Sequence, residues 1–229
     1  MRRVVIKHLS EDSSPQLNSA SELIGRLYRN RGVTEKPDYS LGGLLPPTLK
    51  GLTEATERLI QALSSQEKIL VMGDFDADGA TATTLAVSAL RAMGFEQVDW
   101  IIPDRFRHGY GLTPEVLSDI PKPLPNVILT VDQGISSFEG VAEASRLGMD
   151  VIITDHHLPG TALPEATAIV NPNLAGDPFP SKHLAGVGVV FYLMVALRSA
   201  LRAQDSFKGR YEPRLDPWLD LVALGTVAD

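Results

Sequence analysis

Three aspartates alternate with other residues in Asp74-Phe-Asp-Ala-Asp78, and Gly79 follows them. Carboxylates this close repel one another, so gathering them in one crevice is tolerable mainly when a cation lies between them. The alternative is a solvated acidic loop. The apolar residues 69–72 directly before the aspartates favour a cation site, because such a run is typical of a strand buried on both faces of a parallel sheet.

The same spacing copies the first half of an EF-hand calcium loop. That loop needs a bidentate glutamate six residues after its glycine, and this chain has Leu85 there. A strand also precedes the aspartates where an EF-hand has a helix. The sequence therefore excludes an EF-hand.

Polar residues also follow two later apolar runs. Asp132 follows residues 127–131, and Asp155, His156 and His157 follow residues 151–154. Taken singly, Asp132 could cap a helix and the histidines could be surface residues. Together, carboxylates and imidazoles at three strand ends indicate a site for Mn²⁺ or Mg²⁺. Asp132 could bridge two ions about 3.5–4 Å apart, an arrangement that serves phosphate ester hydrolysis.

Alternating apolar runs and helical patterns surround these residues and predict an α/β fold, a doubly wound and mostly parallel sheet with helices on both faces. Predicted strands span residues 69–72, 98–102, 127–131, 151–154 and 168–170, and predicted helices span residues 19–30, 53–64, 80–93, 114–119, 137–147 and 184–202, with another after Pro217. Capping boxes are predicted at Ser19 and Ser136, and Thr113-Pro114 is typical of a helix start.

The composition, 44% hydrophobic and 21% charged over 229 residues, allows one large domain over residues 51–229 after a helical and Pro/Gly-rich lead-in over residues 1–50. Without cysteine, disulfides and thiolate metal sites are excluded. The net charge of -7 opposes a general nucleic-acid-coating protein but not an enzyme that meets phosphates through metal ions. We expect no signal peptide, no stretch approaching a membrane span, and a soluble protein.

Four segments resemble the successive motifs of the DHH phosphoesterases: Gly73-Asp-Phe-Asp-Ala-Asp-Gly79, Val131-Asp-Gln-Gly134, Thr154-Asp-His-His157 and Leu224-Gly-Thr-Val-Ala-Asp229. Further segments resemble the bacterial single-strand-specific 5′→3′ DNA exonucleases of that family: Arg105-Phe-Arg-His-Gly-Tyr-Gly-Leu112, His156-His-Leu-Pro-Gly160, Asn171-Pro-Asn173 and Leu184-Ala-Gly-Val-Gly-Val189. The resemblance extends over nearly the whole chain from about residue 20.

The resemblance implies roles for individual residues. The implied metal ligands are Asp76, Asp78, Asp132, His156 and Asp229, with Asp74 a ligand or close neighbour. His157 is expected to contact the scissile phosphate or leaving group, and Asp155 to orient the histidines. Many family members have a histidine where this chain has Met72, so one ion is expected to have a thinner ligand set.

The loop with Arg105, Arg107, His108 and Tyr110 mixes cations with an aromatic ring, as single-strand binding sites do. A solvated loop fits the same residues, and the family resemblance favours substrate binding. Lys182 and His183 are further candidates for phosphate contact. Thr81, Thr83 and Thr84 are expected to pack within the first helix, and Gly186 and Gly188 at a helix start.

The function that the resemblance implies is a two-metal exonuclease core, using Mn²⁺ or Mg²⁺, that releases 5′-mononucleotides from single-stranded DNA in repair and recombination. The alternatives are a phosphodiesterase for short oligonucleotides or cyclic dinucleotides, or a fragment that binds metal without cleaving. The family's C-terminal domains, which hold the strand, are absent from these 229 residues. A cytoplasmic monomer working with a helicase and a single-strand-binding protein is expected.

Overall fold

The computed structural model describes residues 19–30, 32 and 43–229, and the chain divides into two units, Met1–Leu45 and Pro46–Asp229. In the first unit, α1 (Ala20–Asn30) is capped by Ser19, whose Oγ accepts a hydrogen bond from the Glu22 amide at 3.2 Å, as predicted. Most of the lead-in predicted over residues 1–50 lies outside the described residues. Residues 46–50 belong to the second unit, where Leu49 is buried in the core.

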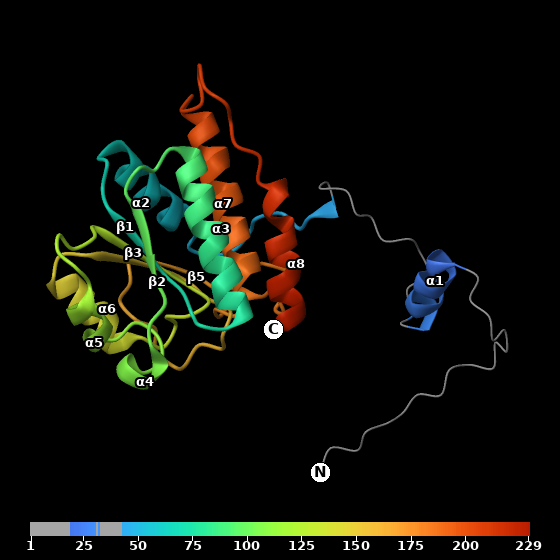
Figure 1. Ribbon diagram of the computed structural model, residues 1–229, viewed down its shortest axis with the longest axis horizontal. Coiled ribbons are helices and arrows are strands. Elements are labelled where there is room, and N and C mark those ends of the chain that lie inside the picture. The colour runs from blue at the N-terminus through green and yellow to red at the C-terminus, as the bar shows by residue number, and fades with distance from the viewer. Residues whose placement is uncertain (1–18, 31, 33–42) are drawn as a thin grey trace, which may run out of the picture. The chain divides into compact units, whose positions relative to one another are not determined.

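Five parallel strands form the sheet of the second unit, in the order β2-β1-β3-β4-β5 (Figure 1). The strands are β1 (Ile69–Met72), β2 (Val98–Ile101), β3 (Val127–Val131), β4 (Asp150–Thr154) and β5 (Ala168–Val170). The order reverses between β1 and β3, which makes this a doubly wound sheet with its switch point there. The predicted fold class is confirmed.

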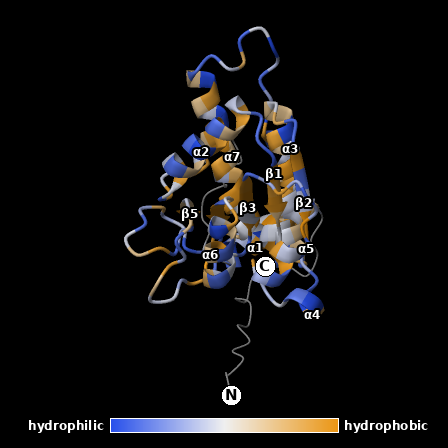
Figure 2. Ribbon diagram, turned by 90° about the vertical axis from the view of Figure 1, so that its left-hand side faces the viewer, coloured by the Kyte–Doolittle hydropathy of each residue, from blue (hydrophilic) through white to orange (hydrophobic). Residues whose placement is uncertain are grey.

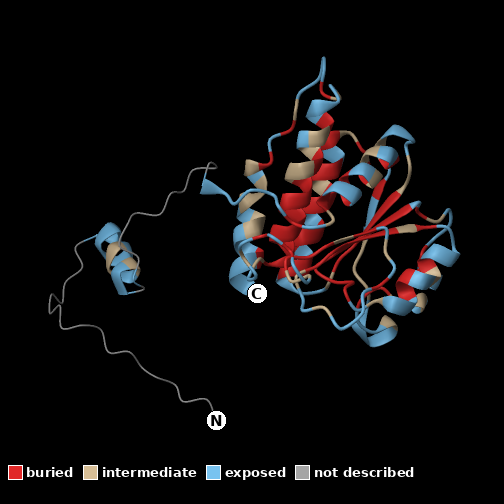
Figure 3. Ribbon diagram, turned by 180° about the vertical axis from the view of Figure 1, so that it is seen from behind, coloured by how far each residue is buried: buried red, intermediate tan, exposed pale blue. Residues whose placement is uncertain are grey.

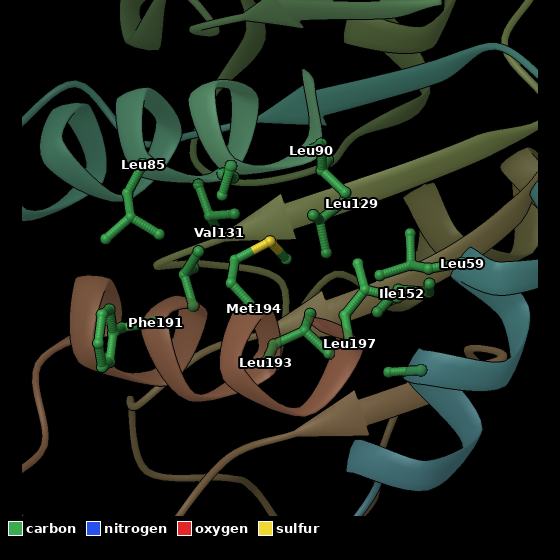
Figure 4. Close-up of a cluster of buried hydrophobic side chains, with 14 of the residues drawn as sticks. Leu59, Leu85, Leu90, Leu129, Val131, Ile152, Phe191, Leu193, Met194 and Leu197 are labelled. Atoms are coloured by element: carbon green, nitrogen blue, oxygen red, sulfur yellow. The ribbon is translucent and has the colours of Figure 1, made fainter. Parts of the chain in front are cut away.

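Helices cover both faces of the sheet (Figure 1). One face packs against α2 (Leu52–Ser64), α3 (Ala77–Met93) and α7 (Gly186–Ala203). The short 3-10 helix η2 (Asp216–Trp218) leads into α8 (Leu219–Ala228), which packs on α3 and α7. The other face packs against α5 (Pro114–Asp119) and α6 (Phe138–Arg146). The side chains between β3, β4 and the first set of helices are drawn in Figure 4.

The central strands are buried on both sides because successive side chains point to opposite faces. In β1, Ile69 and Val71 join the larger hydrophobic cluster with α3 and α7, whereas Leu70 and Met72 join the smaller cluster with α5 and α6. The strands are accordingly apolar along their length and buried between the helical layers (Figures 2 and 3). Two hydrophobic clusters therefore pack on opposite faces of one sheet and fix the positions of its strand ends.

Three local features differ from the sequence prediction. The helix predicted from residue 80 begins at Ala77, because the Asp76 carboxylate caps it by accepting a hydrogen bond from the Gly79 amide at 2.9 Å. The capping box predicted at Ser136 is wrong: α6 begins after Ser137, which makes no side-chain cap and instead accepts a hydrogen bond from the Leu112 amide. A short helix, α4 (Arg105–His108), was not predicted.

The expectation that no stretch approaches a membrane span is wrong on length and composition, since the 18-residue α7 is long and apolar enough to cross a bilayer. However, 61% of it is buried inside the protein. It packs between α2, α3 and α8 and contacts β3 and β4. These contacts account for its apolar character as the central core helix of a doubly wound domain.

Replacing Leu129 by alanine tests whether the larger cluster stabilises the sheet. Leu129 is 0% exposed, and its truncation is expected to lower the free energy of unfolding by about 2–5 kcal/mol through lost burial and a residual cavity. Chemical denaturation measures the change, with Leu163→Ala, an exposed leucine, as the control expected to stay within about 0.5 kcal/mol. Equal losses in the two variants would contradict the assigned core.

Candidate active site

The polar strand ends meet at the switch point of the sheet. Residues 74–78 follow β1, Asp132 follows β3, and residues 155–157 follow β4, so the three segments share the carboxyl edge of adjacent strands. In doubly wound sheets this crevice is where ligands bind. The convergence predicted from the sequence is therefore present.

Asp132 lies at the centre of this crevice on an unusual backbone. Its φ is 60°, a left-handed conformation rare for a residue with a side chain, and its amide donates to the Thr154 carbonyl at 2.9 Å. Its carboxylate Oδ1 lies 3.1 Å from His156 Nε2. Both atoms are buried, and neither makes a hydrogen bond of good geometry among the described residues. Buried polar atoms left in this way are suited to a ligand.

Three groups of side chains bring their ligand atoms within 4.8 Å of one another. They are Asp78 with His156 and Asp229, Asp74 with Asp76 and Asp132, and Asp132 with His156 and His157. The first two groups are joined by the Asp132–His156 contact. Carboxylates with imidazole and no sulfur are the donors that Mn²⁺ and Mg²⁺ take, so the residues present fit a pair of such ions.

Asp78 also has a structural contact that sequence reasoning missed. Its two carboxylate oxygens accept hydrogen bonds from the amides of Gly186 and Val187, at 2.6 and 2.8 Å, at the start of α7. A carboxylate is stabilised there by otherwise unpaired amides and by the helix dipole. Asp78 therefore joins α3, which carries it, to α7 across the active edge.

Two glycines allow helices to approach the carboxylates. A Cβ on Gly186 would lie 2.4 Å from Asp132 Oδ1, and a Cβ on Gly225 in α8 would lie 2.8 Å from Asp78 Oδ1. Both distances are shorter than any van der Waals contact. The glycine at the start of α7, predicted as a packing feature, is thus required by the site itself.

Burial changes the proton affinity of the carboxylates. It raises the pKa of Asp132 to about 7 and raises the pKa values of Asp74 and Asp78 above the ordinary range, since each charged form loses hydration. The adjacent Asp132 carboxylate raises the pKa of His156. Without a cation, the site therefore retains protons near neutral pH.

Asp155 orients the second histidine. Fully buried, it accepts hydrogen bonds through Oδ1 from His157 Nδ1 at 2.7 Å and through Oδ2 from the Ile135 amide at 2.9 Å. Burial opposes its charge, but these bonds hold its pKa below the usual range. The pairing raises the pKa of His157 to about 9. For His156, Asp155 accepts only the backbone amide, so its predicted orienting role concerns the ring of His157 alone.

Other residues that fix the strand-end loops were missed as functional residues. Asn171 and Asn173 donate through their side-chain amides to the carbonyls of His157 and His156, at 2.9 and 2.5 Å. Gln133, buried beside Asp132, donates to the Met72 and Gly73 carbonyls at the end of β1. These residues lie in the motifs Asn171-Pro-Asn173 and Val131-Asp-Gln-Gly134, which resemble those of the family. No pattern in the sequence, however, predicts which backbone carbonyls their side chains contact.

Residues 105–110, which include α4, divide into two sets. Arg105 and Tyr110 face the site, whereas Arg107 and His108 hold the loop. The Arg105 guanidinium lies 3.8 Å from the ring centre of Phe75 and 5.6 Å from that of Tyr110. Tyr110 in turn lies edge-on to His157, with ring centres 6.3 Å apart. Arg105 and Tyr110 therefore lie on the His157 side of the site, and their contact with a substrate stays a prediction.

The other two predicted contacts in this segment point to a different partner. Arg107 and His108 each lie 2.9 Å from Asp119 of α5, and the Asp104 amide donates to His108 Nδ1. The ion pair of Arg107 and the hydrogen bond that His108 Nε2 donates to Asp119 close the loop, which explains both residues without a substrate.

The remaining predicted phosphate contacts are Lys182 and His183. Lys182 donates through Nζ to the carbonyls of Pro172 and Asp177, at 2.6 and 3.0 Å, which binds together the loop after β5. His183 is exposed. The hydroxyls of Thr81, Thr83 and Thr84 donate to carbonyls within α3, and this agrees with the packing role predicted for them.

With the site described, the comparison with known proteins gives its class. Residues 68–226 match the DHH family, N-terminal domain, and the chain belongs to this family.

The curated relatives include single-stranded-DNA-specific exonucleases named RecJ. The chain is 53% identical over 217 residues to that of Dickeya dadantii, covering 93% of this chain and 38% of the relative, and 52% identical over 212 residues to that of Escherichia coli, covering 90% and 37%. Less than two fifths of the length of these relatives is therefore spanned.

Solved structures give the same grouping. The crystal structure of RecJ from Thermus thermophilus in complex with Mn²⁺ is 37% identical with a TM-score of 0.67, over 88% of this chain and 27% of that one. An exonuclease RecJ bound to manganese is 39% identical with a TM-score of 0.66, over 81% and 44%.

Replacing Asp155 by asparagine is expected to lower the pKa of His157 from about 9 towards its ordinary 6.5, because the paired negative charge is lost. A His pKa raised on folding adds stability below pH 6.5 that disappears as the pH rises through about 9, so the variant should also lose this pH dependence. Metal-free NMR titration of the His157 ring measures the shift, with Asp216→Asn, a carboxylate paired with Arg214 elsewhere on the surface, as the control. An unchanged pKa in Asp155→Asn would contradict the pairing.

Replacing Asp119 by asparagine is expected to loosen α4, because Arg107 and His108 lose their shared carboxylate. Limited trypsin digestion followed by mass spectrometry should then show faster cleavage after Arg105 and Arg107. The matched control is Asp216→Asn, which breaks an ion pair with Arg214 elsewhere on the surface and should leave cleavage in α4 unchanged. Equal rates in all three proteins would show that the ion pairs do not hold the loop.

Proposed function

We propose that this chain is the catalytic DHH part of a single-strand-specific DNA exonuclease that uses two Mn²⁺ or Mg²⁺ ions and releases 5′-mononucleotides. The observation that carries the proposal is the pair of ligand groups at the switch point, joined through Asp132 and His156. The names of the RecJ relatives and the manganese-bound structures support the substrate and the metal.

The first group, Asp78, His156 and Asp229, and the second, Asp74, Asp76 and Asp132, would hold the two ions. When bound, such ions offset the charge of a phosphodiester and lower the pKa of water. The two groups approach each other where Asp132 Oδ1 lies 3.1 Å from His156 Nε2, and this supports one phosphate bound by both ions.

His157 is placed to serve the leaving group. Its Nδ1 is bonded to Asp155, so its Nε2 is directed away from that carboxylate, and about half of the side chain is exposed to the crevice. A pKa of about 9 keeps the ring protonated at neutral pH. His157 Nε2 can therefore donate a hydrogen bond or a proton to the departing oxygen. Arg105 adds a positive charge on the same rim.

We further propose, on the family resemblance, that the parent enzyme is a cytoplasmic monomer acting in DNA repair and recombination with a helicase and a single-strand-binding protein. The strand is held in part by domains beyond the length spanned here. The net charge of -7 supports this division, because a surface of this balance alone attracts a polyanion weakly.

The proposal is tested with a 5′-labelled DNA single strand in Mn²⁺. The chain should release 5′-mononucleotides and spare the duplex, and Asp132→Ala should lose activity by about 100-fold or more, since even residues behind the metal ligands cost 10–100-fold. In parallel, Mn²⁺ should raise the melting temperature of the wild type but much less that of Asp132→Ala.

Lys208→Ala serves as the control and should match the wild type in both assays. Lys208 is exposed and follows the C-terminal end of α7, the end opposite Gly186. Metal stabilisation without cleavage would show that the metal site is formed but that the longer relatives' other domains are required. No stabilisation by millimolar Mn²⁺ would refute the metal site.

A further inference from the structure

A cavity of about 400 Å³ lies beside the active site on the α5 and α6 side of the sheet. Its floor is buried and is made by Leu112, Ile135 and Asp155, and its sides include the rings of Tyr110 and Phe138. The cavity is of the size of sites that hold small organic molecules. Its aromatic sides suit a flat ring system.

The charges around the cavity oppose a phosphate. No lysine or arginine is among the described residues that line it, whereas Glu115 and Glu139 lie at its exposed rim. Apart from the imidazole of His157, at the end of the cavity next to His156, a phosphate group placed there would face carboxylates alone. The occupant is therefore expected to be neutral, with polar groups that can meet the side-chain oxygens of Ser136, Ser137 and the two glutamates.

The cavity is continuous with the reaction centre. His157, which lines it, has its ring centre 4.7 Å from that of His156, a member of the first metal group. Tyr110 lies edge-on to the same His157 ring. A molecule in the cavity is thus a direct neighbour of a phosphate held at the two groups.

We propose that this cavity is a subsite for the nucleobase at the 5′ end of the strand, which stacks on Tyr110 and Phe138 while the phosphate on the 3′ side of the same nucleotide lies at the metal groups. Cleavage there breaks the bond between that phosphorus and the 3′-oxygen of the terminal sugar, which takes up a proton as the mononucleotide leaves. A pocket with a buried floor accommodates a terminal unit better than a continuing chain. Stacking is indifferent to sequence because every base has a flat face. This inference rests on the proposed nuclease function and adds the group that recognises the strand end.

The test uses the 3′-monophosphate of 2-aminopurine deoxyribonucleoside, a fluorescent analogue of the terminal unit that carries its phosphate at the position of the scissile group and needs no strand cleavage. In Mn²⁺, the chain should quench its fluorescence saturably. Phe138→Ala should weaken binding by about tenfold, as expected for one lost base–aromatic contact. Ser136→Phe, which fills the cavity, should have at least the same effect. Tyr211→Ala, which removes an exposed aromatic ring outside the cavity, should bind as the wild type does.

Deoxyribose 3-phosphate, which lacks the base, should compete at least tenfold less well than the nucleotide. In cleavage assays, Phe138→Ala should raise KM for normal strands but not for strands with an abasic 5′ end. Equal nucleotide binding by wild type, Phe138→Ala and Ser136→Phe would overturn the subsite whether or not the chain is a nuclease. Quenching that depends on Phe138 without any strand cleavage would support the subsite and show that cleavage requires the other domains of the longer relatives.

Discussion

The contact between Asp78 and the first amides of α7 holds the active edge together. One buried carboxylate at the start of α3 accepts from Gly186 and Val187, so the helix after the first strand is joined to the helix after the last. A charge-assisted bond to a neutral donor contributes about 1.5–3 kcal/mol, and an unpaired buried amide costs a similar amount. One of these oxygens, Asp78 Oδ2, also lies 3.8 Å from His156 Nε2. Helix packing and the assembly of the metal groups therefore depend on one side chain.

The fold otherwise concentrates charge at a free-energy cost. Asp132 adopts a positive φ, Gly186 lies against its carboxylate, and burial raises the pKa values of three of the clustered aspartates. Each feature makes the metal-free site less favourable than an ordinary surface. A ligand that binds only the folded form returns this free energy as stability. The two hydrophobic cores on either side of the sheet keep the strand ends in place until then.

The elements that the sequence could predict are those set by local patterns. The runs at residues 69–72 and 127–131 are apolar throughout because both faces of these strands are covered, and Thr113-Pro114 starts a helix through backbone geometry alone. Contacts between distant segments carry no such pattern. Arg107 and His108 resemble phosphate ligands in sequence but pair with Asp119, and Lys182 binds backbone carbonyls. A cationic side chain has the same sequence signature whether it meets a phosphate or a carboxylate of its own chain.

The two ligand groups differ in donor chemistry, and Met72 accounts for part of the difference. It lies fully buried in the smaller core, so the position where many family members have a histidine contributes apolar packing here. The group of Asp74, Asp76 and Asp132 is consequently all oxygen, whereas Asp78 and Asp229 are joined by the imidazole of His156. Oxygen-only donors suit Mg²⁺ as well as Mn²⁺, while imidazole favours the transition metal. The two ligand groups are therefore not equivalent in their donors, because β1, which precedes Asp74 and Asp76, contributes Met72 to the smaller core.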